Sequence, residues 1–66
     1  MSDIDKFIIF CLESYKSAMN LNGQQALEDF ENYDVFSYLN DGFNVLHTQG
    51  RKYLVVDIND YIAHRR

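Results

Sequence analysis

The chain has 66 residues, of which 47% are hydrophobic and 15% aromatic, with no proline, one cysteine and a formal charge of −4. This length allows one small domain over residues 1–66 and excludes two. The hydrophobic content excludes a disordered chain, and the acidic balance argues against a protein that grips a phosphate backbone. Scaling laws give about 4,400 Å² of folded surface for such a chain. A domain this small is marginally stable alone, so self-association or a partner can matter to it.

Charged residues divide the chain into an acidic middle and a mildly basic end. Residues 17–50 carry five acids and neither lysine nor arginine, so their net charge is −5. Residues 51–66 carry four basic and two acidic side chains, a net charge of +2. A solvated face is the commoner explanation of such an acidic run. The functional alternative is docking onto a basic protein surface, where charge complementarity raises the association rate and the specificity.

The first helix is expected to begin near Asp3, with Ser2 or Asp3 as its cap, and to stop by Gly23. The apolar run over residues 7–12 is too short to span a membrane. Cys11 lies in this run and has no partner for an internal disulfide, which predicts an inert thiol in a reducing, cytoplasmic compartment. The apolar residues of the helix fall within an arc of about 140°, a normal core-facing stripe. They are Ile4, Phe7, Ile8, Cys11, Leu12, Tyr15, Ala18 and Met19.

Ile9 and Phe10 lie outside that stripe, about 140° and 240° from Ile4, among charged and polar residues. The sequence leaves two explanations open. Another part of the fold covers them, as when a central helix is wrapped on several sides, or they face another protein. Under the second explanation they are candidate partner-binding residues.

A second helix is expected from residue 23 or 24 to residue 32, with Asn22 as its cap. Its apolar side predicts that Glu28 and Glu31 point outward, which makes them candidate contacts for a basic partner. After a turn, Asp34 is expected to cap the next element.

Residues 35–47 are ambiguous. Their apolar side chains are spaced as in a helix, whereas Gly42 inside that stretch costs about 1 kcal/mol relative to alanine. The preferred interpretation is a helix, bent at Gly42 and ending at Gly50. The alternative ends the helix at Gly42 and pairs strands over 43–47 and 51–56 in a β-hairpin.

The last helix has Asp57 as a strong cap candidate, with Asp60 at the capping-box position. It begins either there, after an extended piece over 53–56, or as early as Lys52. The elements together predict an all-α fold, a compact four-helix miniature domain. A short β-hairpin or extended piece around 43–56 is the alternative to a helix in that segment.

Patterns for catalysis or metal binding are weak. His47 and His64 are far apart and have no cysteine or carboxylate at ligand spacing, and the three glycines are too isolated for a phosphate-binding loop. We therefore predict a protein that is not an enzyme and needs no cofactor. The densest polar cluster, His47-Thr48-Gln49, is either a recognition surface or a set of side chains that satisfies carbonyls at a helix end. The helix-end role is the commoner one.

Three segments, FIIFCLESYK, ALEDFENYDVFSYLNDGFNVLHTQG and YLVVDINDYI, together resemble a family of small bacterial proteins known as domain of unknown function 3791. The resemblance covers about residues 3–62 and is strongest over 45–50, with Tyr53 and residues 57–58 after it. The family has no assigned activity. Its members are often encoded beside a protein that resembles an ADP-ribosyltransferase toxin, which implies an antitoxin-like or immunity-like binding role by association.

The leading hypothesis from the sequence is a non-enzymatic protein-binding module, the antitoxin-like half of a bacterial pair. A second hypothesis is a self-associating structural domain, most simply a homodimer through the first helix. A weak DNA-binding regulator ranks third, because ten acids oppose the four cations near the end of the chain, and no membrane association is expected. Those cations are Arg51, Lys52, Arg65 and Arg66.

Overall fold

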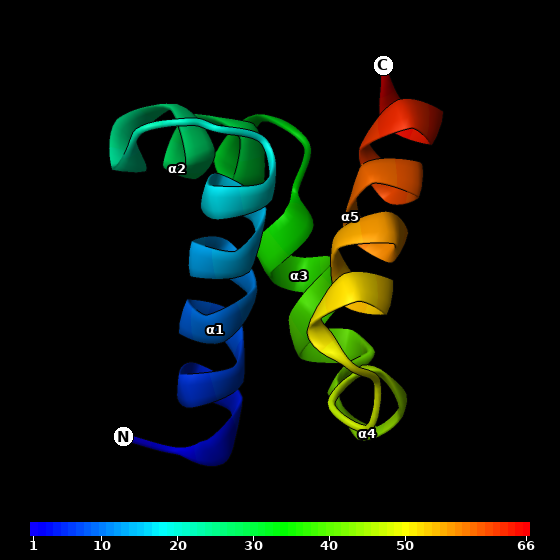
Figure 1. Ribbon diagram of the computed structural model, residues 1–66. Helices are drawn as coiled ribbons and strands as arrows, with labels where there is room; N and C mark the ends of the chain where they lie inside the picture. Colours follow the sequence, from blue (N-terminus) through cyan, green and yellow to red (C-terminus); the bar gives the residue numbers. More distant parts are fainter.

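The computed structural model describes all 66 residues and contains five helices without strands (Figure 1). They are α1 (Asp3–Ala18), α2 (Gly23–Asn32), α3 (Val35–Asp41), α4 (Phe43–Leu46) and α5 (Arg51–Arg65). The predicted all-α class is confirmed. The fifth helix arises because the segment expected to form one bent helix divides at Gly42 into α3 and the single turn of α4. None of the five has the length and apolar character that a membrane crossing requires.

Helix α1 is the centre of the fold and packs against α2, α3 and α5. In Figure 1, α1 and α5 run in the same direction, α2 crosses the end of α1, and α3 descends behind them. α2 lies at the C-terminal half of α1, where the ring centroids of Tyr15 and Phe30 are 5.4 Å apart. α4 lies at the opposite end, where Phe7 meets Phe43 edge to face at 5.4 Å. α2 and α4 therefore occupy opposite ends of the molecule.

The core consists of eleven buried apolar side chains, to which every helix contributes. The total accessible surface is 4379 Å², in agreement with the about 4,400 Å² expected for a compact chain of this mass. One polar residue, Ser14, is buried with them. The apolar members are Phe7, Cys11, Tyr15, Ala26, Phe30, Val35, Leu39, Leu46, Leu54, Ile58 and Ile62.

The starts of the first two helices follow the predicted capping chemistry. Ser2, one of the two candidates, caps α1 by accepting a hydrogen bond from the Asp5 backbone N–H at 3.2 Å. Asn22 caps α2 and accepts from the Gln25 N–H at 2.8 Å, while the Gln25 side chain accepts from the Asn22 N–H at 3.1 Å. This reciprocal capping box satisfies two backbone donors that the first turn leaves free.

One predicted cap is right in position only, and another is wrong. Asp34 is the N-cap of α3, but its side chain makes no capping hydrogen bond, and its left-handed conformation, with φ of 57°, turns the chain from α2 into α3. Asp57 lies inside α5, which begins at Arg51 with Gly50 as its N-cap. The early start extends the helix by more than a turn ahead of Asp57, and Leu54, Ile58 and Ile62 bury one continuous face.

The alternatives with a β-hairpin over 43–56, or an extended piece over 53–56, are also wrong, since residues 43–46 and 51–65 are helical. Gly42 explains the break between α3 and α4. A Cβ at this position would lie 2.8 Å from Leu46 Cδ1 and 3.2 Å from the Tyr38 carbonyl oxygen. The absence of a side chain therefore lets the buried Leu46 of α4 fold back against the end of α3.

A hydrogen bond joins α1 to α2 beside the core: the Tyr15 hydroxyl donates to Asp29 Oδ2 at 2.6 Å. Tyr15 is almost fully buried, and Asp29 is half-buried. Burial of Tyr15, this hydrogen bond and the negative charge of Asp29 all raise the pKa of the Tyr15 hydroxyl. The bond is short and charge-assisted, so it is among the stronger single polar interactions in the fold.

We expect Tyr15→Phe to lower the free energy of unfolding by about 1–2 kcal/mol, because the ring packing stays and the charge-assisted bond is lost. Urea titration followed by circular dichroism measures this loss. Tyr33→Phe is the matched control. Tyr33 is a half-buried tyrosine whose hydroxyl makes no hydrogen bond. Equal losses in the two variants would show that the bond to Asp29 contributes nothing.

Candidate functional site

The exposure of Ile9 and Phe10 removes one of the two explanations for their position on α1. Their side chains are 46% and 44% exposed. No other part of the fold encloses them, so the interpretation that another part of the fold covers these two side chains is wrong. Two large apolar residues, adjacent in sequence, thus face solvent in the middle of the central helix. Their role in binding a partner stays a prediction.

Glu28 and Glu31 are exposed on α2, as the helical pattern predicts. Glu28 accepts a hydrogen bond from Gln24 Nε2 at 3.1 Å. Neither forms an ion pair, since the one salt bridge of the structure joins Lys16 to Glu13 on α1. Both carboxylates are therefore free to meet a basic group from outside.

The His47-Thr48-Gln49 cluster forms the turn between α4 and α5. Thr48 Oγ1 donates to the Val45 carbonyl at 2.7 Å, and His47 Nδ1 donates to the Phe43 carbonyl at 2.5 Å. The imidazole also stacks on the Phe43 ring, with centroids 4.5 Å apart. These contacts match the helix-end role. Gln49 differs, because its Oε1 is buried and makes no hydrogen bond.

The predicted candidates do not form one site. Glu28 and Glu31 lie on α2, whereas His47, Thr48 and Gln49 follow α4 at the opposite end of the molecule (Figure 1). The structure instead brings together residues of α3 and α5 that the sequence did not single out as a site.

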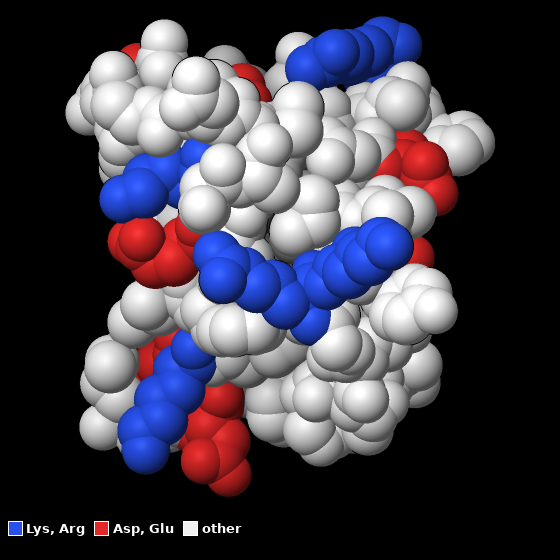
Figure 2. Space-filling model, in the orientation of Figure 1, with Lys and Arg blue, Asp and Glu red and all other residues white.

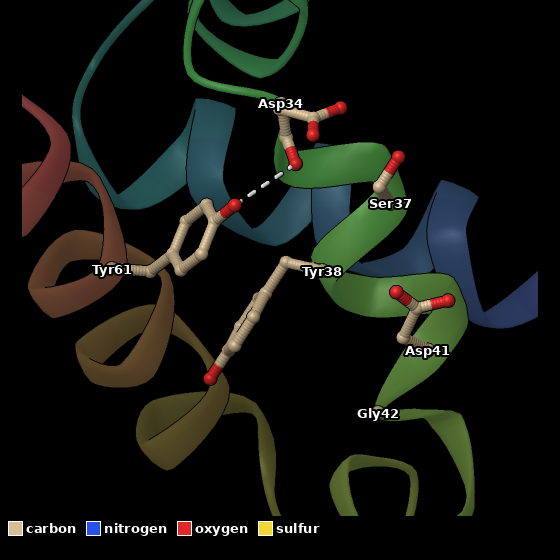
Figure 3. A pocket seen from close by; sticks show the side chains of 6 residues that line it. All are labelled: Asp34, Ser37, Tyr38, Asp41, Gly42 and Tyr61. Atoms are coloured by element: carbon tan, nitrogen blue, oxygen red, sulfur yellow. Dashed lines mark hydrogen bonds between the residues drawn. The ribbon is translucent and has the colours of Figure 1, made fainter.

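A hollow of about 440 Å³ opens between α3 and α5 (Figure 3). The lining residues 34, 37, 38 and 41 are spaced as on one face of a helix, and Tyr61 of α5 lies across from them. We call this the tyrosine hollow. Its residues are Asp34, Ser37, Tyr38, Asp41, Gly42 and Tyr61.

A stacked aromatic pair forms one wall of the tyrosine hollow. The rings of Tyr38 and Tyr61 lie 4.1 Å apart between centroids, with 21° between their planes. The Tyr61 hydroxyl donates to the backbone carbonyl of Asp34 at 3.3 Å, which fixes α5 against the start of α3. In Figure 3, Tyr61 covers one face of the Tyr38 ring, and the other face is turned toward Asp41 and Gly42.

The electrostatic environment of the tyrosine hollow is negative. Asp34 and Asp41 are exposed and form no ion pair. Burial raises the pKa of the Tyr38 hydroxyl, and the nearby charges of Asp57 and Asp60 raise it further. Four carboxylates thus act on this region. On the face of the molecule that Figure 2 shows, lysine and arginine side chains are spread from top to bottom and do not gather into one basic patch.

Sequence reasoning missed the tyrosine hollow, although part of its signal was present. Asp34 and Asp41 belong to the acidic middle, and residues 34, 37, 38 and 41 follow a helical repeat. Nothing local, however, predicts that Tyr61 stacks on Tyr38.

The structure defines a small all-α protein with an exposed apolar pair on its central helix and an acidic, tyrosine-lined hollow between α3 and α5. The chain matches the family model DUF3791, described as a protein of unknown function, over residues 6–65. It therefore belongs to that family, as the sequence resemblance indicates. No curated protein and no solved structure matches the chain.

Proposed function

We propose that this chain is a non-enzymatic protein-binding module, the antitoxin-like or immunity-like partner of an ADP-ribosyltransferase-like toxin encoded beside it. The observation that carries the proposal is the exposure of Ile9 and Phe10 in the middle of α1. Singly exposed apolar residues are common, whereas contiguous exposed apolar surface marks interaction sites. Val45, Tyr53 and Val56 are also exposed, but Ile9 and Phe10 are neighbours on the helix that packs against α2, α3 and α5.

The energetics support a role in binding. Covering the exposed half of each side chain gains about 1 kcal/mol. A partner that binds only the folded chain also stabilises that chain by mass action, which matters for a domain of this size. The five acids of the middle segment supply complementarity to a basic protein surface and raise the association rate.

Co-expression with the product of the adjacent gene tests this proposal. We expect the two proteins to co-purify and the toxicity of the partner to be relieved. The double variant Ile9→Glu/Phe10→Glu should weaken the complex at least about tenfold, because it places two charges in an apolar contact. Calorimetric titration of the purified pair measures the change.

Ala63→Glu is the control variant, because Ala63 is exposed on α5 and gains the same kind of charge. It should bind the partner as the natural chain does. The absence of a complex, or equal weakening by the control, would contradict the proposal. Light scattering measures the oligomeric state and so distinguishes partner binding from the homodimer hypothesis. A dimer that Ile9→Glu/Phe10→Glu converts to a monomer would assign α1 to self-association instead.

A further inference from the structure

The tyrosine hollow has the dimensions and lining of a site for a side chain rather than for a large ligand. Its volume of about 440 Å³ lies near the lower end of the range for ligand pockets. One face of the Tyr38 ring is turned into it, toward Asp41 (Figure 3). An aromatic face with a carboxylate beside it can contact a flat cation by stacking and by charge at once.

The charges around the hollow favour a positive occupant. Asp34 and Asp41 line it, and neither carboxylate is neutralised by a basic side chain. Asp57 and Asp60 of α5 add to the negative potential at Tyr38. A cation placed against Tyr38 would therefore meet an aromatic ring in a region of negative potential.

The chain itself shows that its tyrosines accept guanidinium groups. Arg65 Cζ lies over the Tyr61 ring, 5.1 Å from its centroid, and Arg66 Cζ lies 5.5 Å from the centroid of Tyr33. Both distances are within the range of a cation–π contact. Tyr38, in the same aromatic pair as Tyr61, has no such cation of its own.

We propose that the tyrosine hollow binds the guanidinium of an arginine side chain presented by the protein partner, stacked on Tyr38 and paired with Asp41. This inference rests on the proposed function, since it assumes that a protein is bound. An arginine fits better than a lysine, because the planar guanidinium stacks on an aromatic face and is less strongly hydrated than an ammonium. Asp34, at the other end of the hollow, adds long-range attraction.

An NMR titration of the full chain tests the site without the partner. The probe is N-acetyl-arginine amide, and its neutral isostere N-acetyl-citrulline amide is the matched ligand control. We expect the arginine probe to shift the resonances of Tyr38, Asp41 and Tyr61 with a Kd on the order of 10 mM. The citrulline probe should leave these resonances unchanged, because it has no charge.

Two variants and one control locate the contact. Tyr38→Leu should weaken binding of the arginine probe about two- to fivefold. Asp41→Asn should weaken it about two- to fourfold, and it keeps the test valid if Tyr38→Leu fails to fold, because Asp41 is exposed. Asp5→Asn removes one exposed acid from α1, which belongs to no candidate binding surface, and it should change nothing.

The inference is overturned if citrulline shifts the same resonances, if no shift occurs near Tyr38, or if Asp5→Asn weakens binding as much as Asp41→Asn. A parallel titration with spermidine addresses a free polyamine as the ligand, and binding at least about tenfold tighter than the arginine probe would assign the hollow to polyamines instead. The titration contains no partner protein, so its failure would not contradict the proposed function. A failed co-purification would likewise leave the result of the titration unchanged.

Discussion

Phe30→Ala is expected to lower the free energy of unfolding by about 3–5 kcal/mol and to leave much of the chain unfolded at room temperature. Phe30 is fully buried, and its ring contacts those of Tyr15 and Phe36, each at 5.4 Å between centroids. A chain of 66 residues has a total stability of roughly 3–10 kcal/mol. One truncation that opens a cavity at the junction of α1, α2 and α3 can therefore remove most of it.

Phe10→Ala is the control for this truncation, because it deletes the same atoms from a side chain that is 44% exposed. It should lower the free energy of unfolding by less than about 1.5 kcal/mol, since the lost side chain is only half removed from water and leaves no enclosed cavity. Urea titrations of both variants by circular dichroism give the comparison. Equal losses would place Phe30 outside the core and contradict the packing described above.

The helices were predictable where burial and local signals agree. In α1, the predicted stripe contains the buried Phe7, Cys11 and Tyr15, and its C-terminal end carries the exposed Ala18 and Met19. In α2, the predicted cap Asn22 is the observed N-cap, and the buried Ala26 and Phe30 lie on the predicted apolar side. Capping and periodicity in these segments depend on neighbours within one or two turns, so a single sequence contains most of the information.

The segment around Gly42 and the start of α5 depended on tertiary contacts. The apolar repeat over 36–46 continues through Gly42 without interruption, and the break follows from the approach of Leu46 to the end of α3. Asp57 is a favourable capping residue, yet the burial of Leu54 one turn earlier outweighs it. Local preferences are worth about 1 kcal/mol, and burial of a leucine is worth about twice that.

The exposed pair Ile9 and Phe10 and the tyrosine hollow also differ in how far they depend on tertiary contacts. The position of Ile9 and Phe10 outside the core stripe is a property of one helix, so the sequence identified them. It did not show whether another part of the fold covers them or whether they face solvent. The tyrosine hollow requires α3 and α5 to pack side by side, with Tyr61 against Tyr38. No pattern within either segment specifies that pairing.

Alkaline pH is expected to unfold the protein through two groups on α1. Burial raises the pKa of the Cys11 thiol from its ordinary value of 9.0 to about 12, and the pKa of the Tyr15 hydroxyl is raised by burial and by its bond to Asp29. In both, the folded state favours the protonated form. The stability they contribute is intact below the pKa values of the unfolded chain and falls as the pH rises above them.

For Cys11 the loss begins near pH 9 and grows by about 1.4 kcal/mol for each pH unit, toward about 4 kcal/mol at pH 12. Ionisation of Tyr15 adds to it from about pH 10 upward. Because the whole domain has a stability of only several kcal/mol, we expect cooperative unfolding between about pH 10 and 12. Circular dichroism across this range measures the transition.

Cys11→Ala separates the thiol from the rest of the alkaline response. This variant loses some packing at every pH, but its stability should decline less steeply between pH 9 and 10, where the thiol is the earlier of the two groups to ionise. Labelling with a thiol reagent gives an independent readout, since the fully buried Cys11 should react only as the chain opens. Rapid labelling of the folded protein at pH 9, or an unchanged slope in Cys11→Ala, would show that the thiol is not held protonated by the fold.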